Sequence, residues 1–234
     1  MSKYDVRSTE LEMMDYPIED KEVLFSNLRE LELINKLTGG PHLTFKFLEK
    51  ILKGKTGTVT IVDIGFGAGD MMQYIFDNAH KLPVKIKLVG VDLMQEAEEY
   101  FKTHHANLVE NVTIHICDYQ KYFADGGECD IAIAGLFTHH LTDDQLVTFF
   151  SLVNKYAKIG AVVNDLHRHP IAYYGIKIPT QLLSKSKFTK NDAPLSVLRG
   201  FRKQELVDAL VKAGVKKYDV SWQWAFRYLI TILK

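Results

Sequence analysis

The stretch VDIGFGAGD, residues 62–70, decides how this chain folds, because it joins a short buried strand to the start of a helix. The run 59–64 is apolar and β-branched, as buried strands are. Gly65, Gly67 and Gly69 follow, and glycines let the backbone turn tightly and approach a ligand closely. This order is typical of nucleotide-binding α/β folds, although a tight turn without a ligand would use the same glycines.

The spacing of these glycines separates two classes of ligand. The dinucleotide fingerprint G-x-G-x-x-G/A needs a small residue at the sixth position from Gly65, where this chain has Asp70. An acid there would lie close to a bound pyrophosphate, so NAD and FAD are disfavoured, and a dehydrogenase with them. An acidic loop, to which Asp63 also belongs, suits a ligand without phosphates that carries a sulfonium and an ammonium group.

Strands and helices alternate along most of the chain. Hydrophobic periodicity predicts further strands at 86–91, 112–117, 130–134 and 161–165, and helices at 19–37, 43–53, 69–80, 94–108 and 142–157. This alternation predicts a parallel sheet covered by helices on both faces, which is a doubly wound α/β fold.

The two ends of the chain depart from this alternation. We assign residues 1–53 to an N-terminal helical extension and residues 54–234 to one compact unit. After a helix at 202–213, two strand-like runs at 215–222 and 224–233 predict a hairpin at one edge of the sheet.

The amino-acid composition limits the cellular compartment and the binding partners that we expect for this chain. The chain is 47% apolar and 25% charged, an ordinary globular balance, and its 29 basic residues equal its 29 acidic ones. It therefore has no bulk charge bias towards nucleic acid or anionic membranes, and we expect no nucleic-acid partner.

The N-terminus is too polar for a signal peptide, and no apolar run could span a bilayer. Cys117 and Cys129 are expected to be buried and reduced, which favours a cytoplasmic protein, and a homodimer is compatible with the sequence.

Two further acids end predicted strands. Asp92, in VGVDLM, could accept hydrogen bonds from both ribose hydroxyls of a nucleoside, although an acid there is also a common helix cap. Asp118, in HICDY, could accept from an adenine amino group while Tyr119 or Leu93 packs on the ring. The carboxyl ends of parallel strands meet at one edge of the sheet, where such folds bind ligands, so these acids and the glycine loop should lie together.

The order VDIGFGAGD, VGVDLM, ICDY, DIAIAGLFTHHL and GAVVNDLHRHP, over residues 58–168, resembles the class I S-adenosylmethionine-dependent methyltransferases. The resemblance implies a Rossmann-like sheet of seven strands, of which the last is antiparallel in a terminal hairpin. It also implies S-adenosylmethionine as the cofactor and a small molecule as the methyl acceptor.

The same resemblance implies roles for single residues. The loop glycines would approach the methionyl part of the cofactor, with Asp63 near its ammonium group. Asp92 would hold the ribose and Asp118 the adenine, and Gly135 and Leu136 would offer backbone near the sulfonium.

A narrower resemblance is carried by ELEMMDYP, FTHHL, NDLHRHPIAY, KFTKNDAPLSVLRGF and WAFRYLI. These segments are similar to bacterial methyltransferases associated with type III polyketide synthases. That resemblance implies a hydrophobic phenolic or quinol acceptor that is methylated on oxygen.

A phenol has a pKa near 10, so a general base would accelerate its methylation by roughly 10²–10⁴-fold. Histidine suits this task near neutral pH. His139 and His140 follow the fourth predicted strand, beside the expected methyl site, although either could simply pack or cap the next helix. His167 follows the fifth strand, and Asp165 could orient its imidazole.

Metal binding is the rival interpretation of these histidines. His167 and His169 could converge with the pair at 139–140, but an HxH loop before Pro170 is weak evidence. The acid-rich site of metal-dependent catechol methyltransferases has no match here, so we predict no metal.

The acceptor pocket is expected outside the common core, with plain core packing as the alternative for its apolar members. Its predicted members are Met13, Met14, Tyr16, Arg168 and Tyr173. The stretch 184–198 is interpreted as a loop that forms either a moving lid or a static cap.

Two other functions remain open at this point. The acceptor atom could be carbon, nitrogen or a carboxylate oxygen, although GLFT at 135–138 lacks the Asn/Asp-Pro-Pro-aromatic motif of many enzymes that methylate nucleic-acid amines. The chain could also bind S-adenosylmethionine without catalysis, since fold alone does not prove turnover.

Overall fold

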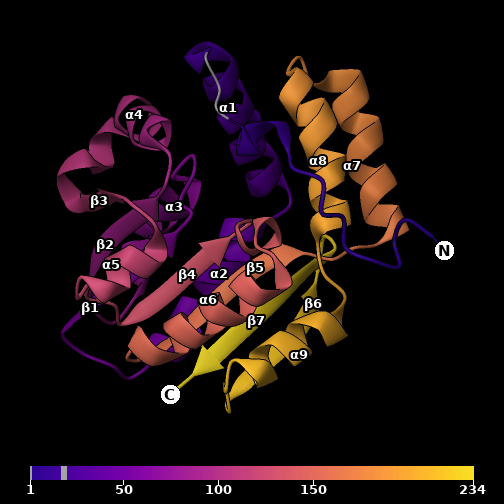
Figure 1. Ribbon diagram of the computed structural model, residues 1–234. Coiled ribbons are helices and arrows are strands. Elements are labelled where there is room, and N and C mark those ends of the chain that lie inside the picture. The colour runs from indigo at the N-terminus through magenta and orange to yellow at the C-terminus, as the bar shows by residue number, and fades with distance from the viewer. Residues whose placement is uncertain (1, 17–19) are drawn as a thin grey trace.

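The computed structural model describes residues 2–16 and 20–234, and its centre is a seven-stranded sheet in the order β3-β2-β1-β4-β5-β7-β6 (Figure 1). The strands are β1 Thr58–Ile64, β2 Lys85–Asp92, β3 Val112–Ile116, β4 Ile131–Gly135, β5 Gly160–Leu166, β6 Tyr218–Gln223 and β7 Arg227–Leu233. The first five are parallel, and β7 runs antiparallel to both β5 and β6. The predicted doubly wound α/β fold with a terminal hairpin is confirmed.

The order of the strands places a switch point between β1 and β4. From β1 the chain moves outward to β2 and β3, and it then returns to add β4 and β5 on the other side of β1. Connections leaving the carboxyl ends of β1 and β4 therefore diverge, which opens a crevice of the kind where α/β sheets bind ligands.

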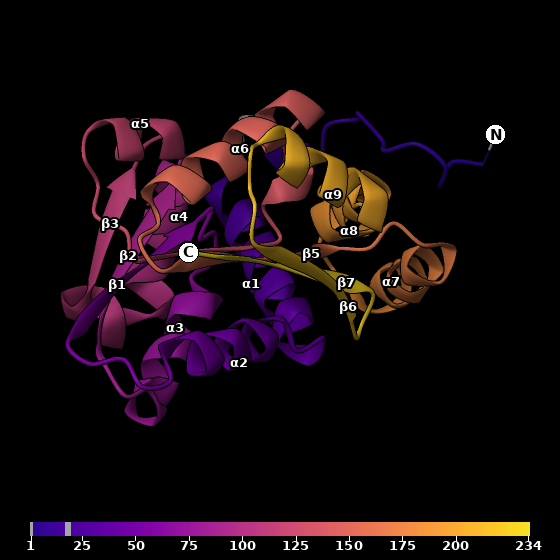
Figure 2. The same cartoon turned by 90° about the horizontal axis from the view of Figure 1, so that it is seen from below.

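Helices cover both faces of the sheet (Figure 2). One face packs against α5 Tyr119–Ala124, α6 Asp143–Tyr156 and α9 Lys203–Lys212. The other packs against α2 Gly40–Leu52, α3 Asp70–Asn78 and α4 Gln95–His104. Strand β1 is buried from its second residue onward, as a strand with two covered faces should be.

A third group of elements stands over the carboxyl end of the sheet. It contains α1 Lys21–Leu37, α7 Pro170–Leu183, α8 Lys187–Arg199 and the N-terminal segment 2–16 with its short helix η1 Met13–Asp15 (Figure 1). Arg7 holds that segment against residues 139–143. Its guanidinium donates to the carbonyl oxygens of His139 and Leu141 and forms an ion pair with Asp143. Asp20 caps the start of helix α1, because its side chain accepts from the amides of Glu22 and Val23.

The stretch 184–198 corrects the sequence prediction of a loop. It is mostly helix α8, which packs against α7, α1 and η1. Proline usually ends a helix, so Pro194 predicts a break in this stretch. In the structure, Pro194 is buried in a continuous helix. Three short helical turns complete the chain: η2 Ala79–Lys81, η3 Ala106–Asn111 and η4 Thr138–His140. Among the described residues, no helix has both the length and the apolar character needed to cross a bilayer.

Candidate functional site

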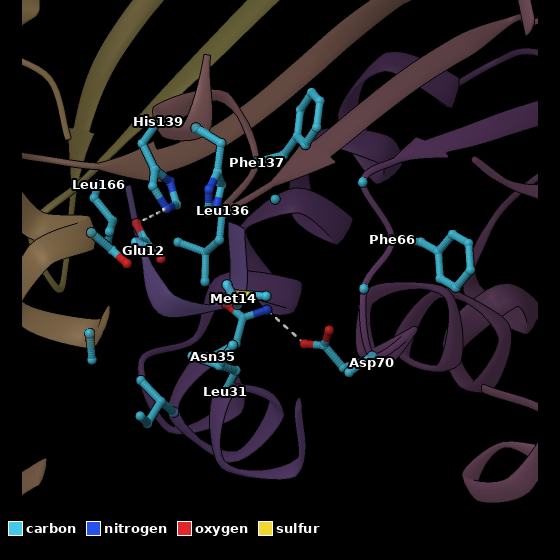
Figure 3. A pocket seen from close by; sticks show the side chains of 18 of the residues that line it. Glu12, Met14, Leu31, Asn35, Phe66, Asp70, Leu136, Phe137, His139 and Leu166 are labelled. Atoms are coloured by element: carbon cyan, nitrogen blue, oxygen red, sulfur yellow. Dashed lines mark hydrogen bonds and ion pairs between the residues drawn. The ribbon is translucent and has the colours of Figure 1, made fainter. Parts of the chain in front are cut away.

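A cavity of about 810 Å³ opens at the carboxyl ends of β1, β2, β3 and β4. Its volume lies in the range of about 300–1,000 Å³ that is usual for small-molecule sites. The sheet forms its floor, while α1, α7, α8 and the N-terminal segment form its walls. Figure 3 shows two polar regions in this cavity: Asp70 and Asn35 in one, and Glu12 and His139 in the other.

The glycine loop adopts the conformation that its sequence predicts. Gly65, Gly67 and Gly69 all have positive φ, at 69°, 51° and 84°. A Cβ on Gly65 would lie 2.3 Å from the Phe137 ring, so only glycine fits there. Gly65 and Gly67 line the cavity, but Gly69 does not, because it packs against the Phe101 ring behind the loop. Gly69 is therefore a structural glycine and not a cavity residue.

Asp92 and Asp118 line the cavity at the ends of neighbouring strands, together with Leu93 and Tyr119, as predicted. The Asp92 carboxylate accepts from the amides of Gly67 and Met94, both at 3.0 Å, and therefore ties β2 to the loop. Burial raises the pKa of Asp92. Asp118 caps α5 by accepting from the amide of Gln120.

Gly135 and Leu136 line the cavity where β4 ends. Leu136 has φ of 54°, which is rare for a residue with a side chain. Its amide donates to the carbonyl oxygen of Asn164 on β5, and this bond holds the strained turn in place.

Asp63, which was expected near the ammonium group of the cofactor, does not line the cavity. Its side chain is fully buried in β1, and burial together with Asp70 and Asp92 raises its pKa well above the ordinary value. Asp70, the first residue of α3, does line the cavity. Burial raises its pKa to about 6.

A chain of polar side chains connects Asp70 to Arg227, the first residue of β7. Asn35 on α1 donates to the Asp70 carboxylate at 2.6 Å and accepts from the Arg227 guanidinium at 3.0 Å. Arg227 also donates to Thr38 at 2.8 Å, and burial lowers its pKa to about 10. Glu32 on α1 also lines this wall of the cavity. The wall therefore presents carboxylates and, on the other side of Asn35, the Arg227 guanidinium, a pattern suited to an amino-acid zwitterion.

The opposite wall contains an anchored histidine. The His139 Nδ1–H group donates to Asp165 at 2.7 Å, and the His139 amide donates to the same carboxylate at 3.1 Å. Although burial opposes it, the contact with His139 holds the pKa of Asp165 well below its ordinary range. Asp165 therefore stays ionised, fixes the ring tautomer and leaves the Nε2 lone pair of His139 free.

The N-terminal segment closes over this histidine. Glu12 Oε1 lies 3.7 Å from His139 Nε2 and has no hydrogen-bond partner among the described residues. Burial raises the pKa of Glu12 to about 7. His140 also lines the cavity, and its Nδ1 pairs with Asp15 at 2.8 Å, while Asp15 in turn pairs with Arg199.

His167 is not part of this cluster, and the expectation that Asp165 orients it was wrong. Pairing between β5 and β7 continues past Leu166, because the His167 amide donates to the carbonyl of Phe226. The ring therefore packs against Tyr228 and Phe226, away from the cavity. Burial lowers its pKa to about 4.

Four predicted acceptor residues lie outside the cavity, and only Met14 lines it. Arg168 is fully buried and bound to Glu205 and to the carbonyl of Gly200, so its role is structural. The others are directed elsewhere: Met13 and Tyr16 are exposed, and Tyr173 packs against Tyr4.

Glu12, Asn35 and Arg227 are cavity residues that the sequence analysis missed. Each lies far along the chain from the residues that it contacts, so no local spacing identifies it. Arg227 offered one signal, since a charged residue opens an otherwise apolar strand.

Comparison with known proteins agrees with the observed fold. The family model described as "Methyltransferase domain" matches residues 61–160. No match was found among curated proteins.

Solved structures share the fold at low identity. Human N-acetylserotonin methyltransferase in complex with SAM is 19% identical, with a TM-score of 0.64 over 97% of this chain and 63% of that one. A plantazolicin methyltransferase in complex with SAH is 16% identical, with a TM-score of 0.65 over 92% of this chain and 90% of that one. An O-methyltransferase family protein from Burkholderia thailandensis is 9% identical, with a TM-score of 0.62 over 88% of this chain and 59% of that one. This chain spans only about 60% of the length of the first matched structures.

Proposed function

We propose that this chain is an S-adenosylmethionine-dependent methyltransferase that transfers the methyl group to a hydroxyl oxygen of an apolar phenolic or quinol small molecule. The observation that carries the proposal is one cavity with two chemically different ends. One end has the glycine loop and acids that suit a cationic nucleoside, and the other has a histidine held by an ionised aspartate.

S-adenosylmethionine is the cofactor, and the strand ends supply its contacts. Asp92 would hold the ribose hydroxyls, and Asp118 would accept from the adenine amino group, with Leu93 and Tyr119 beside the ring. The wall formed by Asp70, Asn35 and Arg227 would bind the methionyl group, because the acid suits its ammonium and the guanidinium suits its carboxylate. Gly135 and Leu136 line the cavity where β4 ends, shortly before His139 in the chain.

His139 would act as the general base. The acceptor hydroxyl would give its proton to Nε2 while its oxygen attacks the methyl carbon. The carbon–sulfur bond would break with its electron pair remaining on sulfur, which becomes neutral. Asp165 would stabilise the imidazolium that forms, since its carboxylate already accepts from Nδ1–H.

The surroundings of His139 support an apolar acceptor. The cavity wall near it carries Leu136, Leu166, Ile176 and Val197. A base is useful for an acceptor that must lose a proton, which favours a phenolic hydroxyl over a carboxylate that is already ionised. A protein that only binds S-adenosylmethionine would not need a buried Asp–His pair facing the cavity.

Substituting Asp92 by alanine tests the cofactor half of this proposal. We expect the Kd for S-adenosylmethionine to rise by at least about 10–100-fold, because even one hydrogen bond to a charged group contributes about 1.5–3 kcal/mol. Calorimetric titration measures this, with circular dichroism to verify folding. The control is Asp77→Ala, an exposed acid on α3, which should leave the Kd unchanged. Equal affinity in Asp92→Ala and wild type would contradict the ribose role.

A further inference from the structure

Three potential metal ligands converge beside the proposed base. Glu12, His139 and His140 each offer one ligand atom, and these atoms lie within 4.8 Å of one another. Glu12 Oε1 and His139 Nε2 are 3.7 Å apart, close to the spacing of about 3.3 Å that bonds of 2.0 Å give around a tetrahedral ion. Small side-chain adjustments would therefore bring this pair onto one ion.

The surroundings of both rings match the outer shell of a metal site. Metal-binding histidines usually donate their second ring N–H to a carboxylate, which fixes the ring and raises its basicity. His139 makes this bond to Asp165 at 2.7 Å, and His140 makes it to Asp15 at 2.8 Å. Both rings keep Nε2 for a ligand.

The charges of this cluster, and a Glu12 oxygen that accepts no hydrogen bond among the described residues, favour a cation. Glu12, Asp15 and Asp165 bring three carboxylates, whereas Arg199, 3.7 Å from Glu12 Oε1, is the guanidinium paired with this cluster. Two negative charges therefore remain when Glu12 is ionised and both rings are neutral. Glu12 is only 1% exposed, and its Oε1 atom has no hydrogen-bond partner among the described residues, an arrangement that normally costs stability.

We propose that Glu12, His139 and His140 form a binding site for one divalent transition-metal ion of the Zn²⁺ type, and that this ion inhibits methyl transfer. Two imidazole nitrogens and one carboxylate select Zn²⁺ and similar ions over Mg²⁺ and Ca²⁺, which prefer oxygen ligands. The inhibition rests on the proposed function, because an ion on His139 Nε2 occupies the lone pair that would accept the acceptor's proton. Metal binding itself does not depend on it.

Titration of the chelator-treated full chain with Co²⁺ and Zn²⁺ tests the site. We expect one ion per chain, with visible Co²⁺ absorption typical of nitrogen and oxygen ligands. Glu12→Gln keeps the size of the side chain but removes a ligand, and it should weaken the metal Kd by at least tenfold. Asp15→Asn should weaken it by about 10–100-fold through His140.

Two control variants separate this site from adventitious binding. His169→Ala removes the rival HxH pair, and His80→Ala removes an exposed histidine, so neither should change the metal Kd. No saturable site, an unchanged Kd in Glu12→Gln, or loss of binding in His169→Ala would each overturn the site.

Kinetics test the inhibition. We expect Zn²⁺ to raise the KM for the acceptor, leave the KM for S-adenosylmethionine unchanged, and be reversed by a chelator. Saturated metal binding with undiminished turnover would overturn the inhibition. Metal binding without any S-adenosylmethionine binding would overturn the proposed function and leave the metal site standing.

Discussion

Replacing His139 by glutamine should lower the turnover number by roughly 10²–10⁴-fold, the usual contribution of a positioned general base. Glutamine can still hydrogen-bond to Asp165, so the buried carboxylate keeps a partner, but it cannot accept the proton at neutral pH. The Kd for S-adenosylmethionine should stay near the wild-type value, because His139 lies at the other end of the cavity from the glycine loop. Methyl transfer to a set of alkylphenols and quinols measures the first quantity, and calorimetry the second.

The matched control is His80→Gln, an exposed histidine far along the chain from the site. It should have wild-type turnover. A His139→Gln enzyme that methylates a phenol at close to the wild-type rate would show that the base lies elsewhere. A fall in cofactor affinity equal to the fall in turnover would show that His139 binds the cofactor instead.

Replacing Arg168 by methionine should lower the free energy of unfolding by about 3 kcal/mol, the lower end of the cost of breaking a buried ion pair. Arg168 is fully buried and donates to Glu205 at 2.5 Å, to the Gly200 carbonyl at 2.6 Å and to the Tyr4 carbonyl at 3.0 Å. Methionine fills much of the same space but donates to none of these oxygens, and only Glu205 keeps another donor, the amide of Arg202. Glu205 is 35% exposed and can reach water, so the loss stays near the lower end of the range.

Urea denaturation measures this loss, with Arg202→Met as the control. Arg202 pairs with Asp5 at 3.1 Å, but both side chains are more than 40% exposed, so its loss should cost less than about 1 kcal/mol. Equal stability of the two variants would contradict the structural role of Arg168. Loss of acceptor affinity in a stable Arg168→Met protein would instead support the acceptor-binding role that the sequence predicted for Arg168.

The sequence predicts the cofactor end of the site well, because each contact there follows from a strand end. Gly65, Gly67, Asp92 and Asp118 come directly after predicted strands, and parallel strands place their carboxyl ends at one edge. The loop conformation also follows locally, since positive φ at Gly65 and Gly67 favours glycine. These features need no knowledge of contacts between distant segments.

The acceptor end could not be predicted in the same way. Asp165 and His167 are two residues apart, so sequence proximity favours their pairing, yet continued pairing of β5 with β7 directs His167 onto Tyr228. Asp165 instead meets His139, which lies on the turn after the neighbouring strand β4. Glu12 reaches the same place only because the N-terminal segment folds back across the sheet. Such contacts depend on tertiary packing, which residue spacing does not encode.

We expect the cavity to bind S-adenosylmethionine and not a dinucleotide. Calorimetric titration of the purified chain with S-adenosylmethionine, with S-adenosylhomocysteine and with NADH tests it most directly. We expect one binding site with a micromolar Kd for the first two ligands and no measurable binding of NADH. Binding of NADH in preference to S-adenosylmethionine, or binding of none of the three, would contradict the assignment of S-adenosylmethionine as the cofactor.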